Sequence, residues 1–226
     1  MSPAPAPRLL PLIWPLYLEL WLGIGVGLVG TALAARQGDA AGGAFAVSHQ
    51  LAAALFVLFR IIGAGASVVL TQRLGGGQRA QADAVARATL GASTWIGGGT
   101  GLGCVLLAGP LLGLLNTPED VRPLAEPFVR WLGLSLLLDA WNASLAAVLR
   151  SHLRSRDTLA VIVAMHGSHL LLCVPLMLGA GPLPPLGLSG FALALLASRV
   201  LGVGLDRKST RLNSSHSQQS RMPSSA

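Results

Sequence analysis

The stretch that decides the fold is LAAALFVLFRIIGAGASVVLTQ, residues 51–72, in which Arg60 is the only charged side chain. A run of about 20 predominantly apolar residues can cross the roughly 30 Å hydrocarbon core of a bilayer as an α-helix. Such a run, interrupted by a single arginine, predicts a membrane-spanning helix.

Similar runs recur along the chain between short polar breaks. The 226 residues are 52% hydrophobic and 11% charged, with a mean hydropathy of +0.63, which exceeds the values of ordinary soluble domains. A signal peptide is the alternative for the first run, but that run is long and contains Glu19. The sequence thus predicts an all-α polytopic membrane protein with six transmembrane helices, at residues 9–35, 44–72, 88–115, 124–149, 159–179 and 188–205.

Arginine placement predicts the orientation of these helices, because cytoplasmic loops retain Lys and Arg. We expect a multi-pass protein of the plasma (inner) membrane with a cytoplasmic N-terminus. The loops are too short for a separate catalytic domain, so no enzyme is predicted, and the net charge of +7 is no sign of nucleic-acid binding. The predicted cytoplasmic side carries Arg8, Arg73, Arg79, Arg87, Arg150, Arg154 and Arg156, and the other side carries Arg36 and Arg122.

Ionisable and polar residues within the spans are the candidate site, because they are costly in a membrane and are usually functional. At the α-helical rise, Glu19, Arg60, Asp139 and His169 all fall near the middle of the bilayer. We expect Glu19 to pair with Arg60, as a structural ion pair. Alternatively, Asp139 or Glu19 exchanges a proton during transport. Asn142, one turn from Asp139, is either an interhelical hydrogen-bonding group or a substrate contact.

Other polar residues are weaker candidates. Arg199 lies within the sixth span and is a possible second counter-ion. His166 and His169 have the spacing of a metal pair, but no further ligand cluster accompanies them, so no metal site is predicted. Cys104 and Cys173 lie in apolar runs, where a thiol behaves as a small hydrophobe, and no disulfide is predicted.

Glycines within the spans are best explained by helix packing. Residues 25–30 match the G-x-G-x-x-G nucleotide pattern, but they lie inside a membrane span rather than after a strand. Small residues let membrane helices approach closely. The glycines expected at such contacts are Gly23, Gly27, Gly30, Gly97, Gly99, Gly101 and Gly103.

Three stretches together resemble the multidrug and toxic compound extrusion (MATE) family. Residues 31–84, from TALAARQGDAAGG to TQRLGGGQRAQADA, are similar to its first two helices and the Gly-rich loop that follows. AAVLRSHLRSRDT, residues 146–158, resembles the end of its fourth helix, and PLPPLGLSGFALALLASR, residues 182–199, the entry into its sixth. The resemblance covers residues 9–203, with all six helices in order.

The resemblance implies a twelve-helix antiporter built from two six-helix lobes. Such a protein exports small amphipathic, often cationic, compounds in exchange for H⁺ or Na⁺ and needs no other cofactor. The chain would be the N-terminal lobe, at residues 1–205, lying in the lipid bilayer with a missing C-terminal lobe as its partner. It departs from the family at Gly30, which matches a first-helix Asp, and at His169 and Cys173, which match an Asn and an Asp. If this lobe couples transport to an ion, we therefore expect the coupling residue to be Glu19, Asp139 or His169.

Two alternatives remain, together with a question about the tail. The first is a lipid-linked oligosaccharide flippase, since such flippases share the superfold and have more basic cavities. The second is a six-helix assembly or interaction subunit, which would need the chain to end naturally near residue 205. The tail DRKSTRLNSSHSQQSRMPSSA, residues 206–226, resembles the conceptual translation of a sequencing-library adapter. We therefore expect the sixth helix to be truncated and the fragment alone to be inactive.

Overall fold

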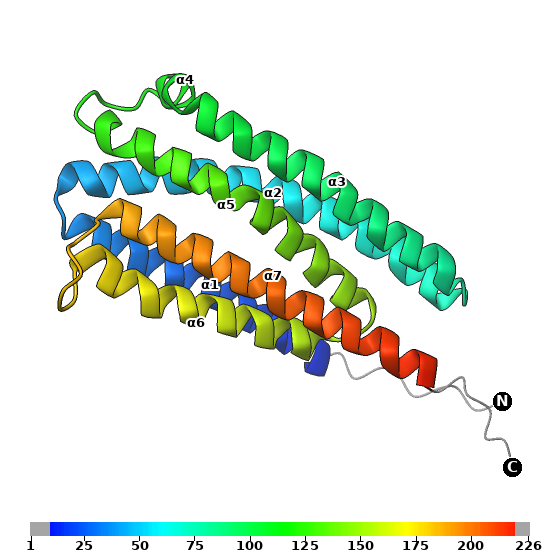
Figure 1. The fold of residues 1–226 in the computed structure, drawn as a ribbon. Helices are drawn as coiled ribbons and strands as arrows, with labels where there is room; N and C mark the ends of the chain where they lie inside the picture. Colours follow the sequence, from blue (N-terminus) through cyan, green and yellow to red (C-terminus); the bar gives the residue numbers. More distant parts are fainter. Residues whose placement is uncertain (1–9, 220–226) are drawn as a thin grey trace, which may run out of the picture.

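A computed structural model describes the backbone of residues 10–219 and the side chains of residues 13–208. Arg8 and residues 220–226 of the predicted tail lie outside the described backbone. Within it the chain is a bundle of long helices (Figure 1). They are α1 (Leu10–Ala35), α2 (Asp39–Gly75), α3 (Arg79–Leu106), α4 (Ala108–Leu114), α5 (Arg122–Ser151), α6 (Ser155–Leu178) and α7 (Leu188–Gln219).

The prediction of six membrane spans is confirmed, with one of them broken. Helices α1, α2, α5, α6 and α7 are each long and apolar enough to cross a bilayer, and α3 with α4 makes a sixth span bent by 83°. The break at Leu107 follows from Pro110, which has no N–H to donate to the carbonyl of Leu106 and whose ring crowds that carbonyl. The α3–α4 span is therefore a helix with a short crosswise end.

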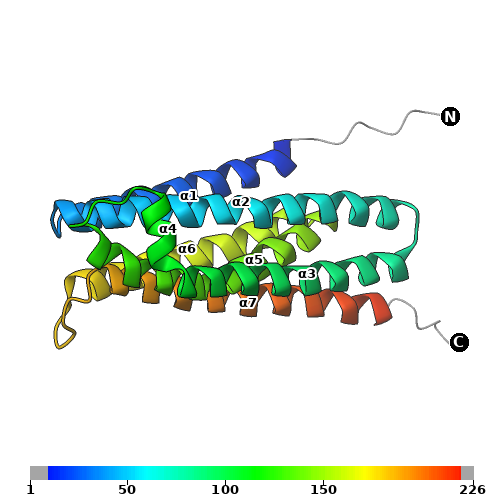
Figure 2. The ribbon, with the colours of Figure 1, turned by 90° about the horizontal axis from the view of Figure 1, so that it is seen from above.

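Five of the helices follow one another around a ring. Neighbours in contact are α1 with α2, α2 with α5, α5 with α7, α7 with α6, and α6 with α1, while α3 packs outside the ring against α5 and α2 (Figures 1 and 2). The N-terminal end of α1, the α2–α3 turn and the α5–α6 turn lie at one end, named here the arginine-rich end. The α1–α2, α4–α5 and α6–α7 connections lie at the opposite end (Figure 1).

Glycine packing is confirmed where α3 meets α5. A Cβ added to Gly97 would lie 2.6 Å from the Cβ of Ala140, and one added to Gly101 would lie 2.6 Å from the carbonyl oxygen of Gly133. Both distances are below any real contact, so only glycine lets these backbones approach. The same expectation is wrong for Gly23, Gly99 and Gly103, whose added Cβ atoms would meet nothing within 4 Å.

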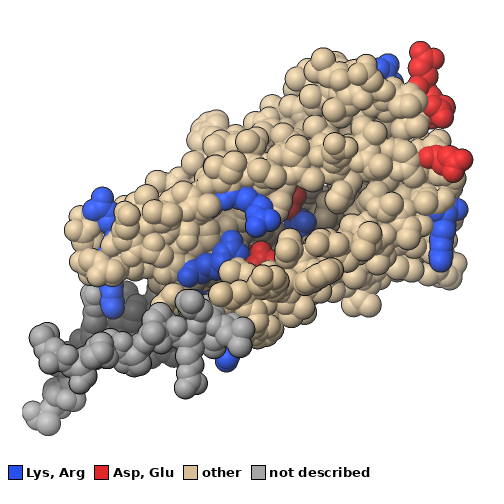
Figure 3. Space-filling view, turned by 180° about the vertical axis from the view of Figure 1, so that it is seen from behind, with Lys and Arg blue, Asp and Glu red and all other residues tan. Residues whose placement is uncertain are grey.

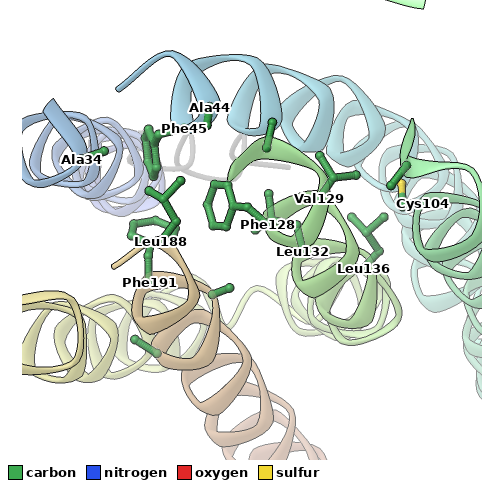
Figure 4. Packing of buried hydrophobic residues seen from close by; sticks show 14 of the residues in the cluster. Ala34, Ala44, Phe45, Cys104, Phe128, Val129, Leu132, Leu136, Leu188 and Phe191 are labelled. Atoms are coloured by element: carbon green, nitrogen blue, oxygen red, sulfur yellow. The ribbon is translucent and has the colours of Figure 1, made fainter. Parts of the chain in front are cut away.

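Three phenylalanines close the ring near its opposite end. Phe45 of α2 lies with its ring centroid 4.9 Å from that of Phe191 on α7 and 5.8 Å from that of Phe128 on α5 (Figure 4). A Cβ added to Gly30 of α1 would lie 2.6 Å from Phe45 and 2.7 Å from Phe191. We name these four residues the aromatic end; they pack α1, α2, α5 and α7 together.

Candidate functional site

A buried ion pair joins α5 to α7 near the middle of both spans. Nε of Arg199 lies 2.5 Å from Oδ1 of Asp139, and the two side chains are only 14% and 10% exposed. At this distance the two opposite charges form an ion pair. The hydroxyl of Ser135 lies 3.4 Å from Oδ2 of Asp139, although its shorter hydrogen bond, 2.8 Å, goes to the carbonyl of Leu132. Arg199, expected only as a second counter-ion, is thus the partner of Asp139.

Asn142 extends this polar contact by one helical turn. Its Nδ2 donates to the backbone carbonyl of Arg199 at 3.2 Å, which is the interhelical bond that the sequence predicted as one alternative. Its Oδ1 is buried and has no hydrogen-bond partner in the described part of the chain. A Cβ added to Gly202 would lie 2.8 Å from this oxygen and 2.9 Å from Sδ of Met165. Glycine at position 202 therefore lets α7 approach both α5 and α6.

His169 brings α6 to the same interface. The residue is 1% exposed, and its ring meets the edge of Phe191 with 4.7 Å between centroids. The Ala194 backbone interacts with the ring electrostatically, but neither ring nitrogen has an aligned hydrogen-bond partner among the described residues. Nη1 of Arg199 donates to Sδ of Met165, one turn before His169, at 3.0 Å. Asp139, Asn142, Arg199 and His169 thus form one polar cluster across α5, α6 and α7.

The expected pairing of Glu19 with Arg60 is wrong in this structure. Glu19 lies with Oε2 3.3 Å from Nη1 of Arg150, and both side chains are 32% exposed. Arg150 is in the last turn of α5, three turns beyond Asp139, or about 16 Å at the α-helical rise. Glu19 therefore does not lie at the same depth in the membrane as Asp139. It lies closer to the arginine-rich end, where the long side chain of Arg150 contacts it.

Arg60 is exposed and forms no ion pair with any of the side chains at 13–208. It continues the α2 face that carries Phe45, His49 and Phe56, since these positions follow at helical spacing. Phe45 contacts α7 and Phe56 packs against the core, so this face points into the ring. Arg60 therefore faces the space between the helices, on the arginine-rich side of the aromatic end.

Charged side chains gather in a hollow on one face of the molecule, within an otherwise uncharged surface (Figure 3). Sequence reasoning missed Arg150 as the partner of Glu19, because it counted Arg150 only among the arginines of the predicted cytoplasmic side. It also missed Met165, which carries no charge that would mark it. Among the described residues, no group of three His, Cys, Asp or Glu side chains is placed to hold a metal ion.

Comparison with known proteins gives a consistent result. The sequence profile of the MatE family matches residues 15–174. The chain is 27% identical over 195 residues to an uncharacterized transporter, YisQ, of Bacillus subtilis (strain 168), covering 86% of this chain and 43% of that protein. The chain therefore spans less than half the length of this relative.

Solved structures share the fold. The TM-score is 0.80 to a MOP-superfamily transporter of Pyrococcus furiosus described as having a binding pocket of reverse polarity, at 19% identity over 88% of this chain and 43% of that chain. It is also 0.80 to an outward-facing multidrug resistance MATE transporter, with the same identity and coverage. For Vibrio cholerae VcmN in its bent form it is 0.78, at 19% identity over 91% of this chain and 46% of that one.

Proposed function

The chain belongs to the MatE family of multi-pass membrane transporters, and from this premise we propose that it forms one lobe of a secondary active exporter. The exporter would lie in the plasma (inner) membrane with its N-terminus in the cytoplasm. It would move small amphipathic, often cationic, compounds outward in exchange for H⁺ or Na⁺. The second lobe would complete the central cavity, so the chain alone is expected to be inactive.

The buried Asp139–Arg199 pair is the observation that carries this proposal. Charged groups inside a membrane are costly and mark ion pathways or structural pairs. Asp139 is an acidic side chain held deep between two spans, against one cation. Binding of H⁺ or Na⁺ to Asp139 would weaken its attraction to Arg199, and α7 would then be free to shift against α5. Such coupling between ion binding and helix packing is what alternating access requires.

The other polar residues have distinct proposed roles. Asn142 and His169 border the pair and offer polar atoms that lack partners, which an ion or a substrate would satisfy. Glu19 and Arg60 lie toward the arginine-rich end, where they would meet a compound entering the hollow.

A lipid-linked oligosaccharide flippase is the second candidate, and Arg60 is the observation in its favour. An exposed arginine facing the hollow, with no acidic partner among the described side chains, is suited to hold a diphosphate group. Export that ignores an imposed ion gradient would favour this alternative over an antiporter.

The test is an efflux assay on the full-length transporter in inverted membrane vesicles. We expect uptake of a fluorescent amphipathic cation to need a proton or sodium gradient and to be lost in Asp139→Asn. Asp120→Asn, in the exposed loop before α5, is the matched control and should transport as the native protein does. Full activity of Asp139→Asn, or uptake unchanged when both gradients are collapsed, would contradict the proposal.

A further inference from the structure

One face of α6 carries a row of nitrogen and sulfur side chains that the proposed transport cycle does not use fully. His169, Cys173 and Met177 follow one another at intervals of four residues, which places them on one helix face. Each is 1% exposed. A buried row of imidazole, thiol and thioether is unusual among the apolar residues that fill this part of the ring.

Two side chains of this row are already in contact. The Cys173 thiol donates to Sδ of Met177, with 3.4 Å between the sulfur atoms. Side chains on an α-helix lean toward its N-terminus, so the long Met177 side chain lies back over Cys173, and Cys173 leans toward the turn of His169. Two sulfur atoms are therefore in contact one turn away from a buried imidazole.

His169 has at least one ring nitrogen without a partner. Both ring nitrogens are buried, the backbone of Ala194 acts on the ring, and neither nitrogen has an aligned hydrogen-bond partner in the described chain. A buried polar atom without a partner costs free energy that a ligand would recover. Met165, one turn earlier, is already engaged by Arg199, so it is not part of this group.

We propose that His169, Cys173 and Met177 form a binding site for a soft monovalent metal ion, Cu(I) or Ag(I). Thiolate and thioether ligands select such ions, whereas hard cations prefer oxygen ligands, which this row lacks. On binding, the Cys173 S–H bond breaks, a sulfur–metal bond forms and the proton leaves to solvent, with no change in oxidation state. One thiolate neutralises one monovalent cation, so the loaded site carries no net charge in the low-dielectric interior.

Charge also argues against a divalent ion at this position. Zn²⁺ on the same three groups would leave one uncompensated positive charge within the membrane, a costly arrangement. Arg199 is the nearby cation that acts on His169, and Asp139 already neutralises it. The site goes beyond the proposed export function and does not depend on it.

The experiment measures Cu(I) binding to the full chain purified in detergent under reducing, oxygen-free conditions, by competition with a coloured Cu(I) chelator. We expect one Cu(I) per chain. Cys173→Ser should weaken binding by at least about 100-fold, and Met177→Leu, which keeps the volume, by about 10-fold, on the scale of losses seen when metal sites are altered. Cys104→Ser is the matched control, because Cys104 is also buried but lies on α3, outside this row.

Failures of folding are separated from failures of binding by circular dichroism and gel filtration of each variant. Cu X-ray absorption of the loaded protein should show nitrogen and sulfur neighbours together. Cys173→Ser that folds and binds Cu(I) as the native chain does would overturn the site. So would equal losses in Cys104→Ser and Cys173→Ser, or Zn²⁺ binding more tightly than Cu(I).

Discussion

The two halves of the helix ring are held together by different forces. At the aromatic end, Phe45, Phe128 and Phe191 pack ring against ring, and Gly30 lets α1 lie directly on Phe45 and Phe191. Toward the arginine-rich end, the contacts that connect the helices include two ion pairs, Asp139–Arg199 in the middle and Glu19–Arg150 beyond it. Close packing resists small displacements, whereas an ion pair can be broken by one bound ion. Movement within this lobe is therefore expected on the arginine-rich side, about a fixed aromatic end.

The largest expected effect is the loss of one member of the buried pair. Asp139→Leu leaves Arg199 charged and buried without a partner, which should lower the free energy of unfolding by about 3–5 kcal/mol. The double variant Asp139→Leu/Arg199→Met replaces both groups by apolar ones and should recover most of that loss. Denaturation in detergent, followed by circular dichroism, measures both variants. If the double variant were as unstable as the single one, the pair would not be the contact that holds α5 and α7 together.

The next effect compares two glycines of the same helix. Gly30→Ala, at the aromatic end, should cost about 1–3 kcal/mol, because the new Cβ overlaps two buried rings that have little room to move. Gly23→Ala, two turns earlier, meets nothing within 4 Å and should be neutral or stabilising by up to about 1 kcal/mol through helix propensity. The same denaturation measurement applies. If the two variants were equally stable, the aromatic end would not be more tightly packed than the part of α1 around Gly23.

The smallest expected effect is at the Glu19–Arg150 contact. Both side chains are about one third exposed and 3.3 Å apart, so Glu19→Gln should change the free energy of unfolding by less than about 1 kcal/mol. A loss as large as that of Asp139→Leu would mean that the charged contacts on this side are as firmly held as the buried pair.

The helices were predictable from the sequence because each apolar run is long and its polar breaks are short. The break at Leu107 was not predicted. Pro110 indicated it, but the apolar run was interpreted by its hydropathy alone, which does not reveal where a helix bends. Likewise, helix α3 begins at Arg79, well before the expected residue 88. A helix can continue beyond its apolar segment where its polar residues are in contact with water.

The site was predictable in its residue types and less so in its pairings. The expectation that Glu19 would meet Arg60 assumed that neighbouring helices turn their charged faces toward each other. Hydropathy does not fix the rotation of a helix about its axis, so the actual partner, Arg150, lies 131 positions along the chain. The pairing of Asp139 with Arg199 needed the α5–α7 contact, which the order of the helices does not reveal.

The central claim about the ring is that Arg60 faces the hollow between the helices and that side chains pack closely at the aromatic end. It is tested most directly by thiol labelling with a membrane-impermeant maleimide, in a chain lacking Cys104 and Cys173 and reconstituted in lipid vesicles. Arg60→Cys and Ala34→Cys are compared, because Arg60 is exposed whereas Ala34 is fully buried, one turn after Gly30 on the same face of α1. We predict that Arg60→Cys reacts from one side of the membrane only and that Ala34→Cys does not react. An unreactive Arg60→Cys would place that face of α2 against lipid, and labelling of Ala34→Cys would show that the aromatic end is open; either result would contradict the account.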